Sequence, residues 1–410
     1  MGSSSRILTI EDLEPENKTV FVRADLNTPV DPFSRKLLDF SRISEACVTL
    51  KDLSNSKVVL ASHQGRVGRY DFISLEEHSK ALSKLLGKDV IFIEDVIGPA
   101  ARNAISSLSK GQILLLDNLR FVAEENYEFK PEDAVKTILI QRLYKFFDMV
   151  VVDAFPTAHR AHPSIVGFPE LLPASGGRLV VKELKALNKI LSISKGPYVT
   201  VLGGAKISDR LEAIDTLIES KRADKVLLTG LIANVFLKAS GKIKQSLGIE
   251  NEEKYVERAK ILLNKYPDTF LMPKDVAISI DDERKEIEVS ELEGEQKICD
   301  IGSKTIEIYS KIIRSAGTIF MSGPPGLFEH KNFQIGTEAL LKAMASSFGT
   351  TIVSGGHLVA ALERFGIREW IDHTSTAGGA LIMYLVGKKL PLFEALENSA
   401  KRFSKSERLI

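Results

Sequence analysis

Short runs of β-branched and aliphatic residues recur along the chain, separated by stretches whose apolar residues have helical spacing. This alternation is typical of βαβ units around a parallel sheet, because each buried strand is followed by a helix that covers one face of the sheet. The pattern predicts strands at 19–25, 57–63, 89–95, 112–118 and 149–155 in the first half, and at 198–204, 225–230, 269–275, 318–324, 350–356 and 370–375 in the second. We expect an α/β fold with two doubly wound, Rossmann-like parallel sheets.

The segment RLVVKELKALNKILSISKGP, residues 178–197, predicts a helix between the two sheets. Its apolar residues fall on one helical face, and the Gly-Pro pair at its end is expected to stop the helix and provide a hinge. The residues of that face are Val180, Leu184, Leu187 and Leu191, and the pair is Gly196-Pro197.

The domain boundaries follow from this helix. We expect a first domain over 1–178, a connecting helix over 179–195 and a second domain over 196–391. The remaining segment, 392–410, carries too few apolar residues to form a third domain. We therefore expect it to pack back on the first domain.

Composition narrows the functional classes. A formal net charge of +1 is too small for generic binding to nucleic acid or to an anionic membrane, which relies on a large excess of Lys and Arg. No apolar run approaches the roughly 18 to 20 residues needed to span a bilayer. Cys47 and Cys299 stand far apart, so neither a disulfide framework nor a thiolate zinc site is expected. We expect a cytoplasmic protein without nucleic-acid or membrane partners, and a monomer, although the sequence leaves the oligomeric state open.

The first ten residues, MGSSSRILTI, contain no apolar signal-peptide segment. Arg6 stands where a myristoylation motif requires Ser or Thr. No targeting segment is therefore expected, and the GSSS stretch fits either a native or an added start.

The segments that follow the strands carry the candidate chemistry, because ligands of open parallel sheets bind outside the carboxyl ends of the strands. In the first half, four strands are followed by RADLNTP, SHQGRVGR, DNLRF and DAFPTAHRAH, each with Arg or His. Four cationic segments at one sheet edge repel one another unless an anion lies between them. A basic anion pocket competes with the simpler interpretation of solvated loop charges, and the gathering of four such segments favours the pocket.

The second half differs, because its strands are followed by LGGAK, TGLIAN, SGPPG, SGGH and TSTAGG. Glycine lets backbone N–H groups approach a phosphate closely, and a helix N-terminus adds a favourable dipole. A single Gly-Gly pair is more often only a tight turn, but several at one edge favour a nucleotide polyphosphate.

Lys206 indicates phosphate binding more specifically than the glycine-rich segments do. In GGAKISDRLEAI it is expected in the first turn of a helix, where a cation is disfavoured by roughly 0.3 to 1 kcal/mol. A lysine that grips a transferred phosphate would explain that cost. Neither G-x-x-x-x-G-K-[ST] nor G-x-G-x-x-G follows a predicted strand, so the P-loop and nicotinamide fingerprints are missing.

Eight segments in this order resemble phosphoglycerate kinase along nearly the whole chain. They are VFVRADLNTPV, ASHQGR, LLLDNLRF, DAFPTAHRAHPS, LGGAKISDRLEAI, SGPPGLFE, VSGGHLVAALERFG and TSTAGGALIMYLVGKKLP. The resemblance implies reversible phosphoryl transfer from 1,3-bisphosphoglycerate to ADP, giving 3-phosphoglycerate and ATP, as in glycolysis and gluconeogenesis. It also implies Mg²⁺ on the nucleotide phosphates and closure of the two domains about the hinge, with electrostatic clamping of the transferred group.

The resemblance also assigns residues. It implies that the triose binds to Asp25, Asn27, Arg42, His63, Arg66, Arg120, His159 and Arg160. It implies a nucleotide side made of Gly204, Lys206, Gly230, Gly326, Glu329, Gly355 and Gly356, with Gly378 and Gly379 near the transferred group. In the family, the catalytic pair at these positions would be Arg42 and Lys206, and no metal ligand is assigned.

Several positions depart from the pattern of many family members and resemble its archaeal branch. Arg210 replaces a lysine, Ser322 replaces an asparagine, and His357 replaces an aspartate. Neutral histidine is a poor partner for a cation as hard as Mg²⁺. The metal is therefore expected on nucleotide phosphates and water, and a hydrogen-bonding role at a helix N-terminus is the alternative for His357.

Two other functions compete with this enzyme. One is a nucleotide-binding protein of the same fold without turnover, against which the presence of Arg42 and Lys206 weighs. The other is a Rossmann-type dehydrogenase, against which both the missing glycine fingerprint and the arginine-rich strand ends weigh.

Overall fold

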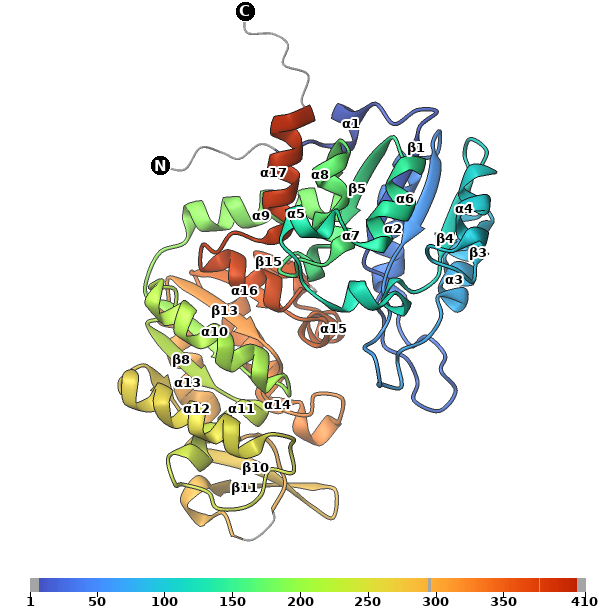
Figure 1. Cartoon of the computed structure of the whole chain (residues 1–410). Coiled ribbons are helices and arrows are strands. Elements are labelled where there is room, and N and C mark those ends of the chain that lie inside the picture. The colour runs from blue at the N-terminus through green and yellow to red at the C-terminus, as the bar shows by residue number, and fades with distance from the viewer. Residues whose placement is uncertain (1–6, 294–295, 376, 404–410) are drawn as a thin grey trace, which may run out of the picture. The chain divides into compact units, whose positions relative to one another are not determined.

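The computed structural model describes residues 7–293, 296–375 and 377–403 (Figure 1). The chain divides into two compact units. Unit 1 comprises Met1–Lys185 and Lys389–Ile410, and unit 2 comprises Ala186–Lys388. Residues 1–6, which carry the GSSS stretch and Arg6, lie outside the described residues.

Unit 1 is built on one parallel sheet with the strand order β3-β4-β2-β1-β5-β6. The strands are β1 (Thr19–Ala24), β2 (Lys57–Ala61), β3 (Val90–Ile93), β4 (Ile113–Leu116), β5 (Met149–Asp153) and β6 (Ala174–Gly176). The α-helices are α1 (Ile10–Leu13), α2 (Ser41–Asp52), α3 (Glu76–Leu86), α4 (Pro99–Ser106), α5 (Pro131–Ala134), α6 (Ile138–Leu143), α7 (Pro163–Val166), α8 (Phe168–Leu171) and α17 (Pro391–Phe403).

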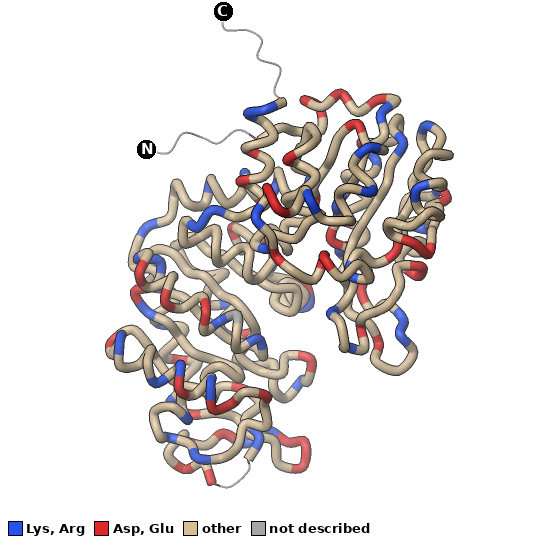
Figure 2. The backbone as a smooth tube through the Cα atoms, in the orientation of Figure 1, with Lys and Arg blue, Asp and Glu red and all other residues tan. Residues whose placement is uncertain are grey.

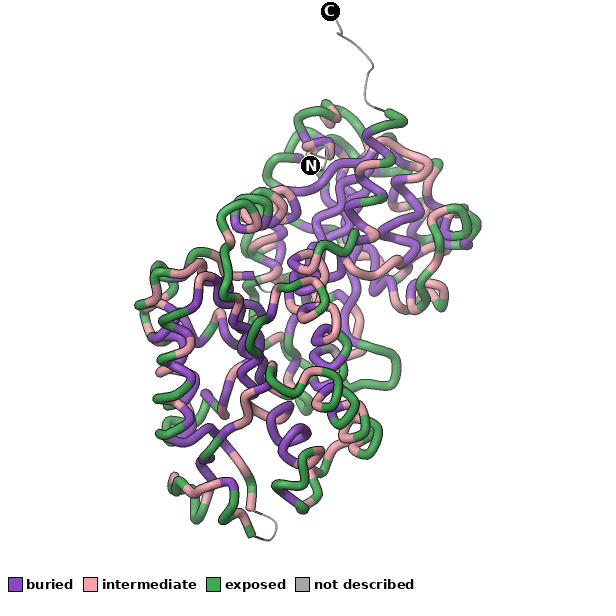
Figure 3. The backbone as a smooth tube through the Cα atoms, turned by 90° about the vertical axis from the view of Figure 1, so that its left-hand side faces the viewer, coloured by how far each residue is buried: buried purple, intermediate pink, exposed green. Residues whose placement is uncertain are grey.

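The core of unit 1 lies on both faces of this sheet, because successive side chains of a strand point to opposite faces. On one face Val20 and Val22 pack in a cluster with Ile43 of α2. On the other face Phe21 packs on Phe168 with ring centroids 4.3 Å apart. Figure 3 shows that buried segments lie inside the units and exposed segments lie at their surface.

The segment after Lys389 belongs to unit 1 although it follows unit 2 in the sequence. Helix α17 contacts α7, α8 and β6. The hydroxyl of Ser399 accepts a hydrogen bond from the backbone of Ala174 at 2.9 Å. Residues 404–410 of the expected tail lie outside the described residues. The helix expected between the sheets is α9 (Arg178–Ile193), which ends before Gly196.

Unit 2 contains a second six-stranded parallel sheet, with the order β15-β14-β13-β7-β8-β9. Its strands are β7 (Tyr198–Leu202), β8 (Lys225–Leu228), β9 (Phe270–Leu271), β13 (Thr318–Ser322), β14 (Thr350–Ser354) and β15 (His373–Ser375). Its α-helices are α10 (Ile207–Glu219), α11 (Gly230–Ala239), α12 (Glu252–Lys265), α13 (Ser303–Ser315), α14 (Ile335–Ala345), α15 (Gly356–Arg364) and α16 (Gly379–Leu385). The prediction of two parallel sheets is confirmed, and each predicted strand segment contains a strand.

A third, antiparallel sheet in unit 2 was not predicted. It has the order β11-β10-β12, with β10 (Asp275–Ile280), β11 (Glu283–Glu288) and β12 (Ile298–Ile301). The segment ERKEIE of β11 is mostly charged and contains no buried residue, so it lacks the apolar alternation of a half-buried strand. Asp281 and Asp282, both with positive φ, join β10 to β11 as expected for a two-residue hairpin turn.

Charged residues are spread over both units, with Lys and Arg interspersed among Asp and Glu (Figure 2). Any concentration of one sign is therefore local. Within the described residues, no helix has both the length and the apolar character required to cross a bilayer.

Candidate functional site

The candidate site of unit 1 begins with an ion pair between Arg42 and Asp25. Arg42 Nη1 lies 2.8 Å from Asp25 Oδ2, and the Asp25 side chain is buried whereas that of Arg42 is partly exposed. Asp25 Oδ1 accepts a hydrogen bond from the Asn27 N–H at 3.0 Å, and Asn27 Oδ1 accepts one from the Gly65 N–H at 2.9 Å. These bonds connect the segments that follow β1 and β2.

Arg120, in the turn after β4, joins the same cluster by donating a hydrogen bond to the Gly65 carbonyl. Burial, and then the positive charges of Arg23 and Arg66, lower the pKa of Arg120 to about 10. The positive charges of Arg23 and Arg66 therefore lie close enough to Arg120 to disfavour its charged form. An anion bound among them would relieve this repulsion.

His63, in the segment that follows β2, is held as a neutral ring. Its Nδ1 lies 3.1 Å from Arg23 Nη2, and a guanidinium group only donates hydrogen bonds. Nδ1 is therefore the acceptor, and the ring proton is on Nε2. Burial, and then the charges of Arg23 and Arg120, hold the pKa of His63 well below its usual value. His63 can thus offer an N–H donor without carrying charge.

Besides Asp25, the cluster contains a second counter-charge, Glu125, a fully buried carboxylate in the 3-10 turn Ala123–Asn126. Arg23 Nε donates to Ser164 Oγ at 2.9 Å, and Ser164 donates its hydroxyl and its backbone N–H to Glu125. Arg23 Nη2 lies 3.8 Å from Glu125 Oε1. Sequence reasoning missed these three residues. An arginine inside the apolar segment TVFVRA was the available signal, because a buried charge must be paired.

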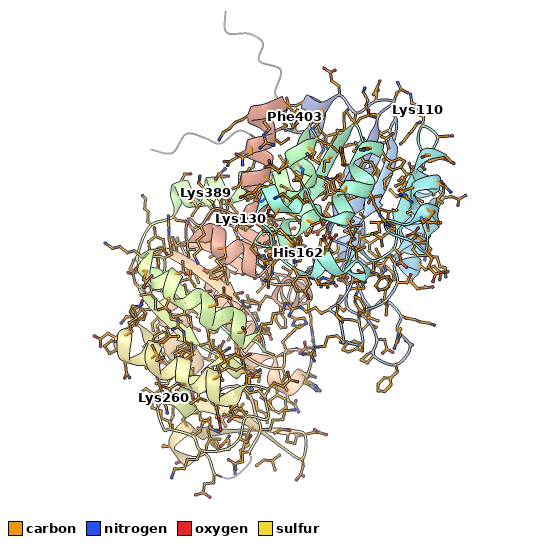
Figure 4. The ribbon with its side chains drawn as sticks, viewed as in Figure 1. Lys110, Lys130, His162, Lys260, Lys389 and Phe403 are labelled. Carbon is orange, nitrogen blue, oxygen red and sulfur yellow. The ribbon has the colours of Figure 1, made fainter. Side chains whose placement is uncertain are left out.

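The DAFPTAHRAH segment forms another wall of this cluster. His162, labelled in Figure 4, is buried, and its Nδ1 lies 3.9 Å from Glu125 Oε1. Burial, and then the charges of Arg23 and Arg120, lower the pKa of His162 to about 3, and His159 and Arg160 contribute to the same shift. Arg160 also forms an ion pair with Glu128 at 2.9 Å.

The structure therefore brings the predicted residues of unit 1 to one place. The links are hydrogen bonds, ion pairs and electrostatic effects on pKa. The residues are Asp25, Asn27, Arg42, His63, Arg66, Arg120, His159 and Arg160.

We expect the buried, neutral His162 to make unit 1 sensitive to acid. Its folded-state pKa, about 3, lies below the unfolded value of about 6.5, so the unfolded chain takes up a proton first as the pH falls. The contribution of neutral His162 to the free energy of unfolding is therefore fully present above about pH 6.5 and is lost as the pH falls towards 3. At pH 5 the loss is about 2 kcal/mol. Urea unfolding at pH 7 and pH 5 should show this loss reduced in His162→Gln. The exposed His330→Gln should retain it, and equal losses in both variants would contradict the prediction.

In unit 2, packing explains some of the predicted glycines. The φ angles of Gly204 and Gly230 are positive, and a Cβ on Gly230 would lie 2.7 Å from the Gly204 nitrogen. The Gly204 N–H donates to the Pro324 carbonyl at 2.8 Å, so the ends of β7 and β13 meet backbone to backbone. Gly326 has no positive φ, but its Cβ would lie 2.4 Å from Asp300 Oδ1. Glycine is required at these positions by the protein itself.

The glycines after β14 and β15 are different. The Gly355 N–H donates to the Ser375 carbonyl at 2.9 Å, which joins the two strand ends. Gly355 has φ +109°, and a Cβ at Gly355, Gly356 or Gly378 would meet nothing within 4 Å. Among the glycines whose surroundings the structure describes, Gly356 and Gly378 alone combine this open space with a φ that other residues adopt. They begin or precede α15 and α16, and Gly379 is the first residue of α16.

Lys206 is the N-cap of α10, and the helix begins at Ile207. The prediction of a lysine inside the first turn was wrong by one residue, because the backbone of Lys206 has not yet adopted helical angles. The side chain is exposed, beside the positive end of the helix dipole. Arg210, one turn later, is buried.

Glu329 and His357 lie in segments that follow β13 and β14. Glu329 is exposed in the loop before α14. His357 is the second residue of α15, and its ring centroid lies 6.1 Å from that of Phe328. Both residues therefore lie on the side of the parallel sheet where its strands end.

Comparison with known proteins gives consistent results. A family model for phosphoglycerate kinase matches residues 10–388. The phosphoglycerate kinase of Methanothermus fervidus is 42% identical over 407 residues, which cover 98% of this chain and 99% of that protein. That of Methanococcus maripaludis is 42% identical over 413 residues, covering 96% and 99%.

Two solved structures are similar over nearly the whole chain. The phosphoglycerate kinase from Pyrococcus horikoshii OT3 is 38% identical, with a TM-score of 0.85, and the match covers 97% of this chain and 100% of that one. The enzyme from Coxiella burnetii is 31% identical, with a TM-score of 0.72, and the match covers 96% and 100%. The expected resemblance, including that to archaeal relatives, is confirmed, and the chain belongs to the phosphoglycerate kinase family.

Proposed function

We propose that this chain transfers a phosphoryl group reversibly from 1,3-bisphosphoglycerate to ADP, giving 3-phosphoglycerate and ATP, as a glycolytic phosphoglycerate kinase. Membership of the family supports the reaction. The observation that carries the assignment of the triose to unit 1 is the cationic cluster of Arg42, Arg66, Arg120 and Arg160. Together with burial and Arg23, positive charges of this cluster lower the pKa values of Arg120, His63 and His162. A substrate with phosphate and carboxylate groups supplies the negative charge that this cluster lacks.

The nucleotide is assigned to unit 2. Gly356 and Gly378 leave open space at the strand ends that no packing within the unit requires. Backbone N–H groups there, with the N-terminus of α15, suit phosphate oxygens. The ATP and ADP side is proposed to consist of the predicted residues Gly204, Lys206, Gly230, Gly326, Glu329, Gly355, Gly356, Gly378 and Gly379.

Catalysis is proposed to rest on positioning and charge. The transferred phosphoryl group spreads its negative charge over equatorial oxygens, so cations held at those oxygens lower the barrier. Arg42 of unit 1 and Lys206 of unit 2 are the proposed clamps. Neutral His63 donates from Nε2 to the triose, and Asp25 holds the Arg42 guanidinium in place.

Magnesium is proposed to enter as part of the substrate, bound to the nucleotide phosphates. Within the described ranges of the chain, no group of three or more His, Cys, Asp or Glu side chains has the arrangement of a metal site. Phosphate oxygens and water are ligands that Mg²⁺ prefers.

A coupled assay tests the proposal directly. Purified protein with 3-phosphoglycerate and MgATP should form ADP, and omission of either substrate should abolish the signal. A protein that binds MgADP but forms no product would instead be a nucleotide-binding protein of this fold.

We also expect the two units to close on their substrates. The proposed clamps, Arg42 and Lys206, belong to different units. Because both cations must reach the same phosphoryl group, the two units must come together. A ligand shifts a conformational equilibrium only through its preference for one state. Small-angle scattering should show a smaller radius of gyration with 3-phosphoglycerate plus a non-hydrolysable MgATP analogue than with either alone. An active enzyme with an unchanged profile would contradict closure.

A further inference from the structure

Asp300, on β12 of the antiparallel sheet, is a buried carboxylate that reaches outside its own sheet. Its Oδ1 accepts a hydrogen bond from the Ile301 N–H at 2.9 Å. Its Oδ2 accepts one from the Gly336 N–H, at the start of α14, at 2.8 Å and one from Arg284 Nη1 at 2.9 Å. The side chain of Asp300 is fully buried. One carboxylate thus joins three separate segments of unit 2.

The segment 323–336 is shaped to fit this carboxylate. A Cβ at Gly326 would lie 2.4 Å from Asp300 Oδ1, and a Cβ at Gly336 would lie 2.3 Å from the same atom. Neither glycine has a positive φ, so backbone conformation does not require glycine here. Glycine is required because the Asp300 carboxylate lies too close to leave room for a Cβ atom.

Arg284, on β11, holds the same segment from the other side. Its Nη1 also donates to the Asn332 carbonyl at 3.2 Å, and its Nη2 donates to the Ile301 carbonyl at 2.8 Å. Asn332 in turn donates to the carbonyl of Asp282, in the hairpin turn, at 3.0 Å. The antiparallel sheet therefore holds the segment at three places. These are Leu327, whose N–H donates to the Cys299 carbonyl at 2.9 Å, Asn332, and Gly336 at the end of the segment.

We propose that Asp300 and Arg284 are positioning residues that hold the segment 323–336 in the conformation that receives the nucleotide. The segment contains SGPPG residues after β13 and Glu329, which are on the proposed nucleotide side. The inference therefore rests on the proposed function. Neither residue touches substrate, and both act through the backbone of the segment.

Burial disfavours the ionised form of the Asp300 carboxylate. Burial raises the pKa of Asp300 to about 6, against the opposing effects of the Gly336 N–H and Arg284. Hydrogen bonds to an ionised oxygen are stronger than those to a neutral one, so the charge strengthens the two bonds by which Oδ2 links α14 and β11.

Asp275 offers a matched control within the same sheet. It is also buried, it accepts hydrogen bonds from the Lys304 and Thr305 N–H groups at the start of α13, and a Cβ at Gly302 would lie 2.3 Å from its carboxyl carbon. Asp275 thus resembles Asp300 in burial, helix capping and glycine contact. The difference is the helix that each carboxylate holds, because Asp275 caps α13 whereas Asp300 binds the segment 323–336.

The test compares Asp300→Asn with Asp275→Asn in the full chain, by melting temperature and by steady-state kinetics with 3-phosphoglycerate and MgATP. Both variants should lower the melting temperature. Only Asp300→Asn should raise KM for MgATP, by on the order of 10-fold. A change of this size corresponds to the free energy of about one hydrogen bond. KM for 3-phosphoglycerate should stay within about twofold in both.

The outcomes distinguish failure of this inference from failure of the proposed function. Melting shifts without a selective rise in KM for MgATP would leave Asp300 with a purely structural role and overturn the inference. No turnover by the wild-type protein would overturn the proposed function instead, and calorimetry with MgADP would then compare the same variants. If Asp300→Asn does not fold, Arg284→Lys decides in the same way, because it keeps a cation for Asp300 but loses the fork that reaches Asn332.

Discussion

Alanine at Arg42 or Lys206 is expected to lower kcat by about 10³ to 10⁵, because each cation is proposed to stabilise charge that develops on the transferring phosphoryl group. KM for each substrate should change far less, since the interaction is stronger in the transition state than in the bound substrates. Coupled kinetics at saturating substrates, with a melting curve for each variant, measure the effect. A change confined to KM would contradict a catalytic role.

Controls for these variants come from the same units. Arg142 on α6 and Lys260 on α12 are exposed (Lys260 is labelled in Figure 4), so Arg142→Ala and Lys260→Ala should keep kcat. Arg42→Ala also removes the partner of buried Asp25. Arg42→Lys retains a positive charge near Asp25, so its kcat should fall less than that of Arg42→Ala if charge at this position drives the reaction.

Gly378→Ala should remove most of the activity without cost to stability. Gly378 has φ −90° and ψ −74°, and a methyl group there would meet no protein atom within 4 Å. Alanine at such a position leaves stability unchanged or raises it by about 0.4 to 1 kcal/mol. The methyl group would occupy the open space in which we propose that a phosphate oxygen approaches the backbone, so kcat should fall by about 10² to 10³.

Gly326→Ala provides the contrast. Its methyl group would collide with Asp300, so this variant should lose about 1 to 3 kcal/mol of stability. Thermal unfolding and kinetics of both variants are measured side by side. A fully active Gly378→Ala would show that the open space is not a ligand site.

Apolar periodicity was sufficient to predict both parallel sheets, because buried parallel strands form continuous aliphatic runs such as ILLL in β4. It missed the antiparallel sheet, whose edge strand β11 is mostly charged and has no buried residue. It also missed β6, in which three small residues give no apolar pattern. These strands depend on pairing with distant segments rather than on their own composition.

The same limit applies to the candidate site. Lys206 was recognisable because it stands in a motif next to a strand end, whereas Arg42 was assigned only by the resemblance to the family. Glu125 was not, because nothing in AEEN indicates that this carboxylate lies beneath a cluster of cations contributed by other strands. Likewise, local sequence cannot distinguish Gly326, which packing requires, from Gly378, which faces open space.

Unit 2 is inserted into unit 1 as a single continuous segment, since the chain leaves unit 1 after Lys185 and returns at Lys389. During synthesis, unit 2 is therefore complete before unit 1. The backbone N–H of Ala174 can form its hydrogen bond to Ser399 only after more than two hundred further residues have been synthesised. Nascent chains that end before α17 should contain a protease-resistant unit 2 beside a protease-sensitive unit 1, because domains fold as units once their sequence is available.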